Sequence, residues 1–146
     1  MKISIILFIL QEMAKPVVFS AIRTSGSVTS GKYFNSYTKF LITYGDAFNL
    51  GSGVFTAPRS GIYQFSAAAT FFRKGENKIS VEKNGTQELQ FYSENEHERG
   101  DDDTLSFNFI MQLQKYDTIR LKVVKGHFDC GTHAVCIFNG YFIREI

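Results

Sequence analysis

Hydrophobic and polar side chains alternate along much of this chain with the two-residue period of β-strands. In residues 104–114 the odd-numbered positions are apolar and the even-numbered ones are mostly polar, so we expect the odd face to lie in a core. In residues 117–125, Ile119, Leu121 and Val123 repeat the same half-buried pattern. We find no segment with a helical period. The pattern predicts an all-β protein built from antiparallel sheets.

Turn signals separate the apolar stretches at the spacing of an antiparallel sandwich. Asn84-Gly85 is a hairpin signal, because a type I′ turn needs positive φ at both central positions. The strands on either side of it should therefore pair, and we expect a second hairpin around Lys115-Tyr116. The expected strands are residues 17–23, 38–43, 52–57, 61–72, 78–84, 87–92, 104–114, 117–125 and 134–145.

Composition favours one domain with an aromatic core. The chain has 146 residues, of which 44% are hydrophobic, and it contains 15 Phe and 7 Tyr but no Trp. A chain of this length buries enough surface for its own core. The net charge is +2 and the basic residues are dispersed, which argues against nucleic-acid binding. No apolar run has the roughly 20 residues that span a bilayer, so we expect no membrane insertion.

The N-terminal residues resemble a targeting segment. Met1-Lys2 precedes eight apolar or small residues, 3–10, as in the short apolar region of a secretory signal. Glu12 fits poorly, because a small residue is preferred three positions before a cleavage after Ala14. We therefore expect residues 1–14 to be a signal peptide or an N-terminal extension, with a terminal strand at residues 3–10 as the alternative. Residues 15–146 are the expected globular domain.

The most informative motif is residues 51–65, GSGVFTAPRSGIYQF, in which a Pro-containing turn and a Gly separate two short strands. This motif resembles the signature of the C1q globular-domain family. Residues 18–24, 81–85 and 138–143 resemble further family segments in the same order, whereas Tyr116-Asp117 departs from the usual Gly-Asp. The resemblance implies a ten-stranded jelly-roll β-sandwich of two antiparallel sheets that forms a compact homotrimer. The sequence contains no collagen-like or heptad repeat, so the family member it resembles is a stalkless one.

The resemblance also implies a function. We expect a secreted, extracellular pattern-recognition protein of innate immunity, acting as a lectin that binds carbohydrate such as sialic acid. One alternative is a signalling ligand of the tumour-necrosis-factor-like superfamily that binds a protein receptor, and another is a structural trimer of the extracellular matrix. We find no catalytic motif and expect no enzyme activity.

Loops with mixed polar and aromatic side chains are the candidate binding surfaces. Arginine and lysine pair with carboxylated sugars, other polar groups bind hydroxyls, and rings stack on the sugar. We expect Phe48, Phe72 and Phe128 to supply such rings. A protein ligand would suit this mixture equally well. The candidate polar ligand residues are Arg73, Lys74, Asn77, His127 and Asp129.

The densest acidic segment is residues 93–104, and its Asp101, Asp102 and Asp103 could supply oxygen ligands to Ca²⁺. Some members of the family that the chain resembles bind calcium at the apex of the head. The segment lacks the spacing of an EF-hand, so a solvated, charged loop is the alternative. We expect no other cofactor.

Two further features concern covalent chemistry. Cys130 and Cys136 flank a short loop that could bring their sulfurs together in an exported protein, whereas a cytosolic protein would keep two thiols. A zinc site or a cysteine nucleophile fits the spacing less well. Asn84-Gly85-Thr86 is also an N-glycosylation sequon, although its turn role explains Asn-Gly without a glycan.

Overall fold

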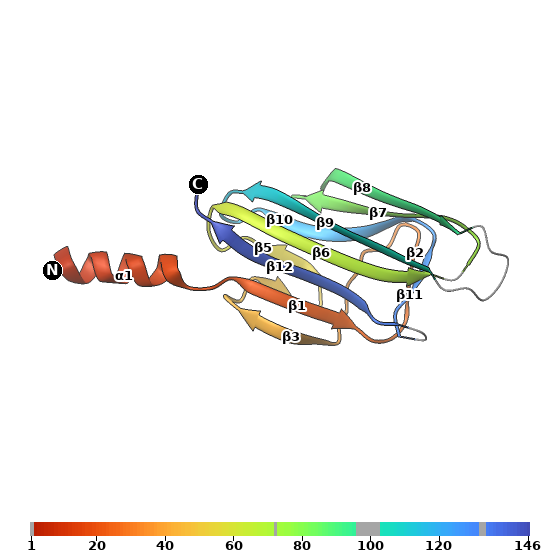
Figure 1. Cartoon of the computed structure of the whole chain (residues 1–146), viewed down its shortest axis with the longest axis horizontal. Coiled ribbons are helices and arrows are strands. Elements are labelled where there is room, and N and C mark those ends of the chain that lie inside the picture. Colours follow the sequence, from red (N-terminus) through yellow and green to blue (C-terminus); the bar gives the residue numbers. More distant parts are fainter. Residues whose placement is uncertain (1, 72, 96–102, 132–133) are drawn as a thin grey trace.

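Two antiparallel β-sheets pack face to face in this protein (Figure 1). The computed structural model describes residues 2–71, 73–95, 103–131 and 134–146. The all-β sandwich of two antiparallel sheets expected from the sequence is confirmed. Each of the nine expected ranges corresponds to a strand, and three shorter strands, β2 (Ser27–Thr29), β4 (Phe48–Asn49) and β11 (His127–Asp129), were not anticipated. The described residues therefore contain twelve strands where the resemblance implied ten.

One sheet has seven strands and the other has five among the described residues. In the larger sheet, β9 pairs with β6 on the edge opposite to β12 and β11. Its strands are β1 (Val18–Arg23), β2 (Ser27–Thr29), β3 (Lys39–Tyr44), β6 (Gly61–Phe71), β9 (Asp103–Leu113), β11 (His127–Asp129) and β12 (Cys136–Arg144). The smaller sheet, in spatial order, contains β4 (Phe48–Asn49), β5 (Val54–Thr56), β10 (Thr118–Lys125), β7 (Gly75–Lys83) and β8 (Thr86–Asn95).

Aromatic rings fill the space between the sheets. The ring centroid of Phe55, on β5, lies 5.0 Å from that of Phe65 on β6 and 5.7 Å from that of Phe19 on β1. Phe138, on β12, meets Phe19 edge-on at 5.2 Å. All four side chains are fully buried. Because β5 belongs to the smaller sheet and the other three strands to the larger one, this cluster joins the two layers.

The corner at residues 57–60 carries the chain from one sheet to the other, since β5 and β6 lie in different sheets. The backbone N–H of Ala57 donates to the carbonyl oxygen of Asp117, and that of Tyr116 donates to the carbonyl oxygen of Ala57. The hydroxyl of Tyr63 donates to the carbonyl oxygen of Arg59 at 2.6 Å. The strand, corner and strand predicted from the signature motif are confirmed.

The expected hairpin around Lys115-Tyr116 is wrong. Strand β9 pairs with β6, whereas β10 pairs with β7 and β5, so residues 114–117 cross between the sheets. The predicted alternation of buried and exposed side chains is confirmed on both β9 and β10, but such alternation does not show which sheet a strand joins. Tyr116 adopts φ 76°, a conformation that suits the glycine usual in the family.

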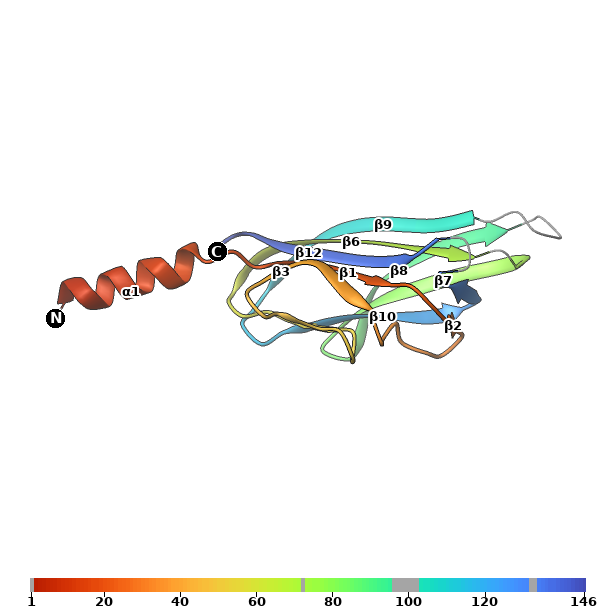
Figure 2. The ribbon, with the colours of Figure 1, turned by 90° about the horizontal axis from the view of Figure 1, so that it is seen from below.

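The N-terminal segment forms helix α1 (Lys2–Ala14), so the alternative of a terminal strand is wrong. Its side chains at residues 3–10 are exposed and, apart from Ser4, apolar on all sides, which explains why no amphipathic period marked it. In two perpendicular views the helix projects away from the sandwich, and the C-terminus lies at the same end of the sandwich as the helix (Figures 1 and 2). The described part of the chain holds no helix that is both long and apolar enough to cross a membrane.

The predicted pairing of β7 with β8 is confirmed, and Asn84 and Gly85 at their turn have φ values of 52° and 81°. The Asn84 amide donates to Oδ1 of Asp117 at 2.9 Å, and the backbone N–H of Gln114 donates to Oδ2 at 2.8 Å. The hydrogen bond from Asn84, with smaller contributions from Gln114 and Lys83, lowers the pKa of the Asp117 carboxyl. Asp117 therefore connects the hairpin tip to the crossing between the sheets.

Replacing Asp117 by asparagine is expected to lower the free energy of unfolding by about 1 kcal/mol at neutral pH. The folded pKa is depressed, so the carboxylate stabilises the fold above its unfolded pKa, and this contribution is lost as pH falls through the folded pKa. Denaturant titrations should show a difference between the two proteins that shrinks below about pH 4. Asp46→Asn, on an exposed turn, serves as the control. A difference that stays constant on acidification would contradict this assignment.

Candidate functional site

Four of the five predicted ligand residues lie at the end of the sandwich opposite to the termini, which we call the distal end and define by residues 73–74 and strand β11. Arg73 and Lys74 are exposed on the turn between β6 and β7. Strand β11 lies beside the end of β6, where Asp129 pairs with Thr70. Figure 1 shows both elements far from α1 and the C-terminus. The fold thus brings together residues that are more than fifty positions apart in the sequence.

The charges at the distal end act on His127, which is half-buried on β11. Burial lowers the pKa of its imidazole, the positive charge of Arg73 lowers it further, and the carboxylate of Asp129 acts in the opposite direction. The imidazole is therefore neutral at pH 7. A neutral histidine offers one N–H donor and one acceptor nitrogen, so Arg73 and Lys74 supply the positive charge of this end.

Asn77 does not belong to this surface, which corrects its prediction as a ligand residue. Its side chain is only 2% exposed, and its amide donates to the carbonyl oxygen of Gly75 at 3.1 Å. A Cβ on Gly126, which has φ 109°, would overlap the Asn77 side chain. The loop before β7 is short and Asn77 already lies inside that strand, so it packs against the β10–β11 connection and faces no ligand.

The aromatic residues expected to stack on a sugar are in the core. Phe48 is 5% exposed and stacks on Phe19, with ring centroids 4.3 Å apart. Phe128 is fully buried between Phe34 and Phe71, and its ring centroid lies 5.8 Å and 5.7 Å from theirs. Phe72 lies outside the described residues. Neither described ring is accessible to a sugar.

The calcium prediction falls largely outside the described part of the chain, which excludes Asp101 and Asp102. Asp103 is the exposed first residue of β9, and its carboxylate accepts a hydrogen bond from the backbone N–H of Thr104 at 2.8 Å. Within residues 2–71, 73–95, 103–131 and 134–146, no three His, Cys, Asp or Glu side chains are grouped as metal ligands would be. Calcium binding at residues 101–103 remains a prediction.

A disulfide joins Cys130 and Cys136, and both residues are buried. It connects the residue after β11 to the first residue of β12, while the backbone N–H of Cys130 donates to the carbonyl oxygen of Gly26. These links hold β11, and therefore His127 and Asp129, against the sandwich. Asn84, the candidate glycosylation site, is exposed, and its amide already serves the hydrogen bond to Asp117.

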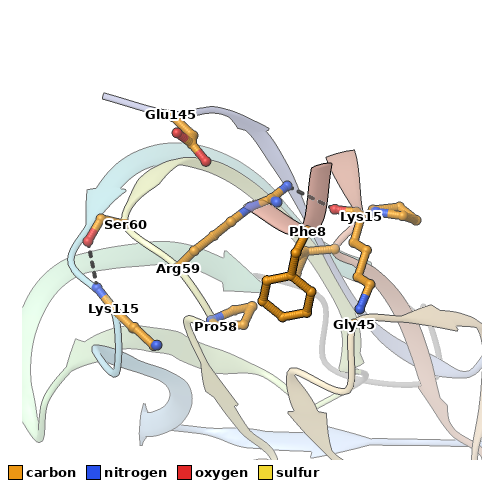
Figure 3. Close-up of a pocket in the computed structure, with 10 residues that line it drawn as sticks. Phe8, Lys15, Gly45, Pro58, Arg59, Ser60, Lys115 and Glu145 are labelled. Atoms are coloured by element: carbon orange, nitrogen blue, oxygen red, sulfur yellow. Dashed lines mark hydrogen bonds between the residues drawn. The ribbon is translucent and has the colours of Figure 1, made fainter. Parts of the chain in front are cut away.

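A hollow of about 500 Å³ lies at the opposite end, between α1 and the corner at residues 57–60 (Figure 3). The guanidinium of Arg59 lies 3.9 Å from the ring centroid of Phe142 and donates to the carbonyl oxygen of Lys15 at 2.9 Å. Phe8 of the helix and Lys115 also line it. None of the predicted ligand residues is here. The hollow lies where the helix meets the sandwich, so its shape depends on the N-terminal segment.

The surface of the larger sheet that points away from the smaller one, which we call the outer face, is rich in exposed apolar side chains. Registers across the sheet align one outward-facing row of residues. Ile110 in this row is 63% exposed, and the hydroxyl of Tyr141 donates to the side-chain oxygen of Gln64 at 2.6 Å. The row consists of Ile110, Gln64, Tyr141, Val18 and Tyr44.

A polar row lies beside it on the outer face. The amide of Asn139 donates to the hydroxyl of Ser66 at 3.1 Å, and the hydroxyl of Ser20 donates to the amide oxygen of Asn139. Ser66, Asn108 and Asn139 also line a hollow of about 270 Å³. The polar groups of this row are thus largely paired with one another, which lowers the cost of covering the face.

Comparison with known proteins agrees with this architecture. The globular domain of zebrafish complement 1qA matches with a TM-score of 0.71 and 18% identity, over 89% of this chain and 99% of that one. The Eiger TNF structure from S. frugiperda matches with a TM-score of 0.70 and 6% identity, over 90% of this chain and 95% of that one. Both likenesses concern the fold. The family model of the C1q domain matches residues 18–143, so this chain belongs to the C1q domain family.

Proposed function

We propose that this protein is a secreted C1q-type lectin that works as a homotrimer and binds carbohydrate with its distal end, as a pattern-recognition protein of innate immunity. One observation carries the proposal. The fold brings the cations Arg73 and Lys74 to the same end as His127 and Asp129, away from both termini. We propose no catalytic role for these residues.

The chemistry of the distal end suits an acidic sugar. The guanidinium of Arg73 is exposed and can hold a carboxylate such as that of sialic acid through two parallel hydrogen bonds. Lys74 adds a second positive charge. The neutral imidazole of His127 and the carboxylate of Asp129 can bind sugar hydroxyls as donor and acceptor. Because the nearby aromatic rings are buried, the site relies on polar contacts and is expected to bind each sugar weakly.

Three copies of the chain would compensate for weak sites. We propose that the outer face is the trimer interface, because its apolar row would otherwise remain in water. Three connected sites raise the effective affinity by about 10²–10⁴-fold when a surface allows them to bind together. The paired polar row beside it can be buried without leaving many unsatisfied groups.

The test is binding of the full chain to an array of neutral and sialylated glycans, in calcium and in EDTA, with competition by free sugar. We expect sialylated glycans to bind and the double variant Arg73→Ala/Lys74→Ala to bind at least about tenfold more weakly. The double variant Lys115→Ala/Arg144→Ala is the control. It removes the same amount of charge from the end of the sandwich that holds the termini, and it should bind normally. Loss of binding in EDTA would support calcium at residues 101–103.

The same array, run on Ile110→Asp, tests the assembly. A charge in the apolar row of the outer face should give a monomer by sedimentation equilibrium, with a weaker array signal but an unchanged affinity for free sugar. A folded trimer that binds no glycan would overturn the lectin proposal and favour a protein receptor, as for a tumour-necrosis-factor-like ligand. Trimer mass that depends on calcium, without glycan binding, would favour a structural matrix role.

A further inference from the structure

A polar pocket of about 460 Å³ opens on the sandwich and is lined in part by β2, the strand that pairs with β11. Segments from β1, β2, the β2–β3 and β4–β5 connections and β10 form its wall. Its lining includes three cationic side chains and no carboxylate. The cations are Arg23, Lys32 and Arg120, and hydroxyl groups of Thr29 and Ser52 lie among them.

Arg120 is the central group of this pocket. Its guanidinium carbon lies 3.1 Å from the ring centroid of Tyr33, whose hydroxyl donates to Oε1 of the buried Glu82 at 2.9 Å. The ring fixes the plane of the guanidinium and covers one of its faces. The Nε atom of Arg120 is buried and has no hydrogen-bond partner among the described residues. A buried donor of this kind is costly unless an acceptor reaches it.

The other two cations have different surroundings. The guanidinium of Arg23 donates to the carbonyl oxygens of Ser25, Asn35 and Ser27, which fixes the loops around the pocket. Lys32 is exposed, and no ion pair to a carboxylate is found for it in the described part of the chain. The pocket thus combines one stacked arginine, one anchored arginine and one exposed lysine without a neutralising side chain in its lining.

The backbone that carries Lys32 and Tyr33 is held firmly on β10. The N–H of Gly31 donates to the carbonyl oxygen of Val123 at 2.8 Å. The N–H of Val123 donates to the carbonyl oxygen of Lys32, also at 2.8 Å. The N–H of Phe34 donates to the carbonyl oxygen of Leu121 at 2.9 Å. The backbone positions of Lys32 and Tyr33 are therefore fixed before any ligand arrives, which reduces the entropy cost of binding.

We propose that this pocket binds the anionic group, carboxylate or sulfate, of an acidic saccharide. Arg120 and Lys32 bind the anion, and the hydroxyls of Thr29 and Ser52 bind neighbouring sugar hydroxyls. The proposal rests on the carbohydrate binding proposed above, but it adds a second site whose lining does not include Arg73 or Lys74. A saccharide with several acidic units could occupy both.

The test is calorimetric titration of the full-length protein with 3′-sialyllactose and with a sulfated heparin disaccharide, and with lactose as the neutral sugar. The two acidic probes distinguish a carboxylate from a sulfate. Arg120→Gln is expected to weaken binding of the preferred probe at least about tenfold, and Lys32→Gln about threefold or more. Lys122→Gln is the matched control, because Lys122 also lies near the Tyr33 ring, at 5.2 Å, but does not line the pocket. It should bind within about twofold of wild type.

Lys32 is exposed, so Lys32→Gln leaves the fold intact and keeps the test valid if Arg120→Gln unfolds. Normal binding by both variants, with binding lost in Arg73→Ala/Lys74→Ala, would overturn the pocket and leave the lectin proposal standing. If no sugar binds, the lectin proposal fails. Binding of inorganic sulfate then tests the pocket. Sulfate should shift the Nε–Hε NMR signal of Arg120, which is assigned as the signal that is missing from the spectrum of Arg120→Gln. No shift would overturn the pocket as well.

Discussion

Replacing Phe65 by alanine is expected to lower the free energy of unfolding by about 3–5 kcal/mol, a large share of the stability of a domain of this size. Phe65 is fully buried, and its ring contacts Phe55, Phe109 and Phe138. Truncation would leave a cavity between the two sheets that the surrounding strands cannot close. Denaturant unfolding followed by far-UV circular dichroism, at one protein concentration, measures the change.

Tyr92→Ala is the control for this measurement. Tyr92 lies on β8 with 48% of its surface exposed, so losing its ring should cost less than about 1 kcal/mol. Equal losses of stability in the two variants would contradict the view that the aromatic cluster between the sheets supplies the main packing energy.

Gly53→Ala is expected to cost about 3–4 kcal/mol, because two penalties act together. Gly53 has φ 71°, which disfavours any side chain, and a Cβ there would overlap the backbone carbonyl oxygen of Phe34. A backbone atom cannot rotate away as a side chain can. Since Phe34 follows Tyr33, moving its backbone would also disturb the polar pocket that Tyr33 lines, called the side pocket below.

Gly31→Ala separates the two penalties. Gly31 has φ 84°, but a Cβ there would meet no atom within 4 Å, so the expected cost is about 1 kcal/mol from backbone strain alone. Thermal and denaturant unfolding of both variants give the comparison. If Gly53→Ala lowered the free energy of unfolding no more than Gly31→Ala does, the inferred close packing of the β4–β5 turn against residue 34 would be contradicted.

The sequence pattern was sufficient for strand positions but not for all strand partners. Alternation along β9 and β10 correctly indicated which side chains face the core. In a sandwich, however, strands of opposite sheets show the same alternation toward the same core. The hairpin predicted between them failed for this reason, whereas the Asn84-Gly85 turn succeeded because its φ requirements are local.

The candidate site was predicted less completely than the fold. The sequence predicts strands at residues 61–72 and 78–84, so Arg73 and Lys74 fall in the short connection between them. Their exposure follows from that position. Burial of Asn77 and Phe128 depends on the packing of β11 against its neighbours, and β11 itself is too short to give a pattern. The side pocket was missed because Arg23, Lys32 and Arg120 come from separate segments that only the folded sheets bring together.

The position of both termini at one end of the sandwich has a practical consequence. A fluorophore, an affinity tag or a biosensor linker can be attached to the C-terminus without lying near Arg73 or His127. Protein immobilised in this way would stand on its base with the distal loops directed into solution. Oriented attachment therefore makes every captured molecule equally accessible to a soluble analyte.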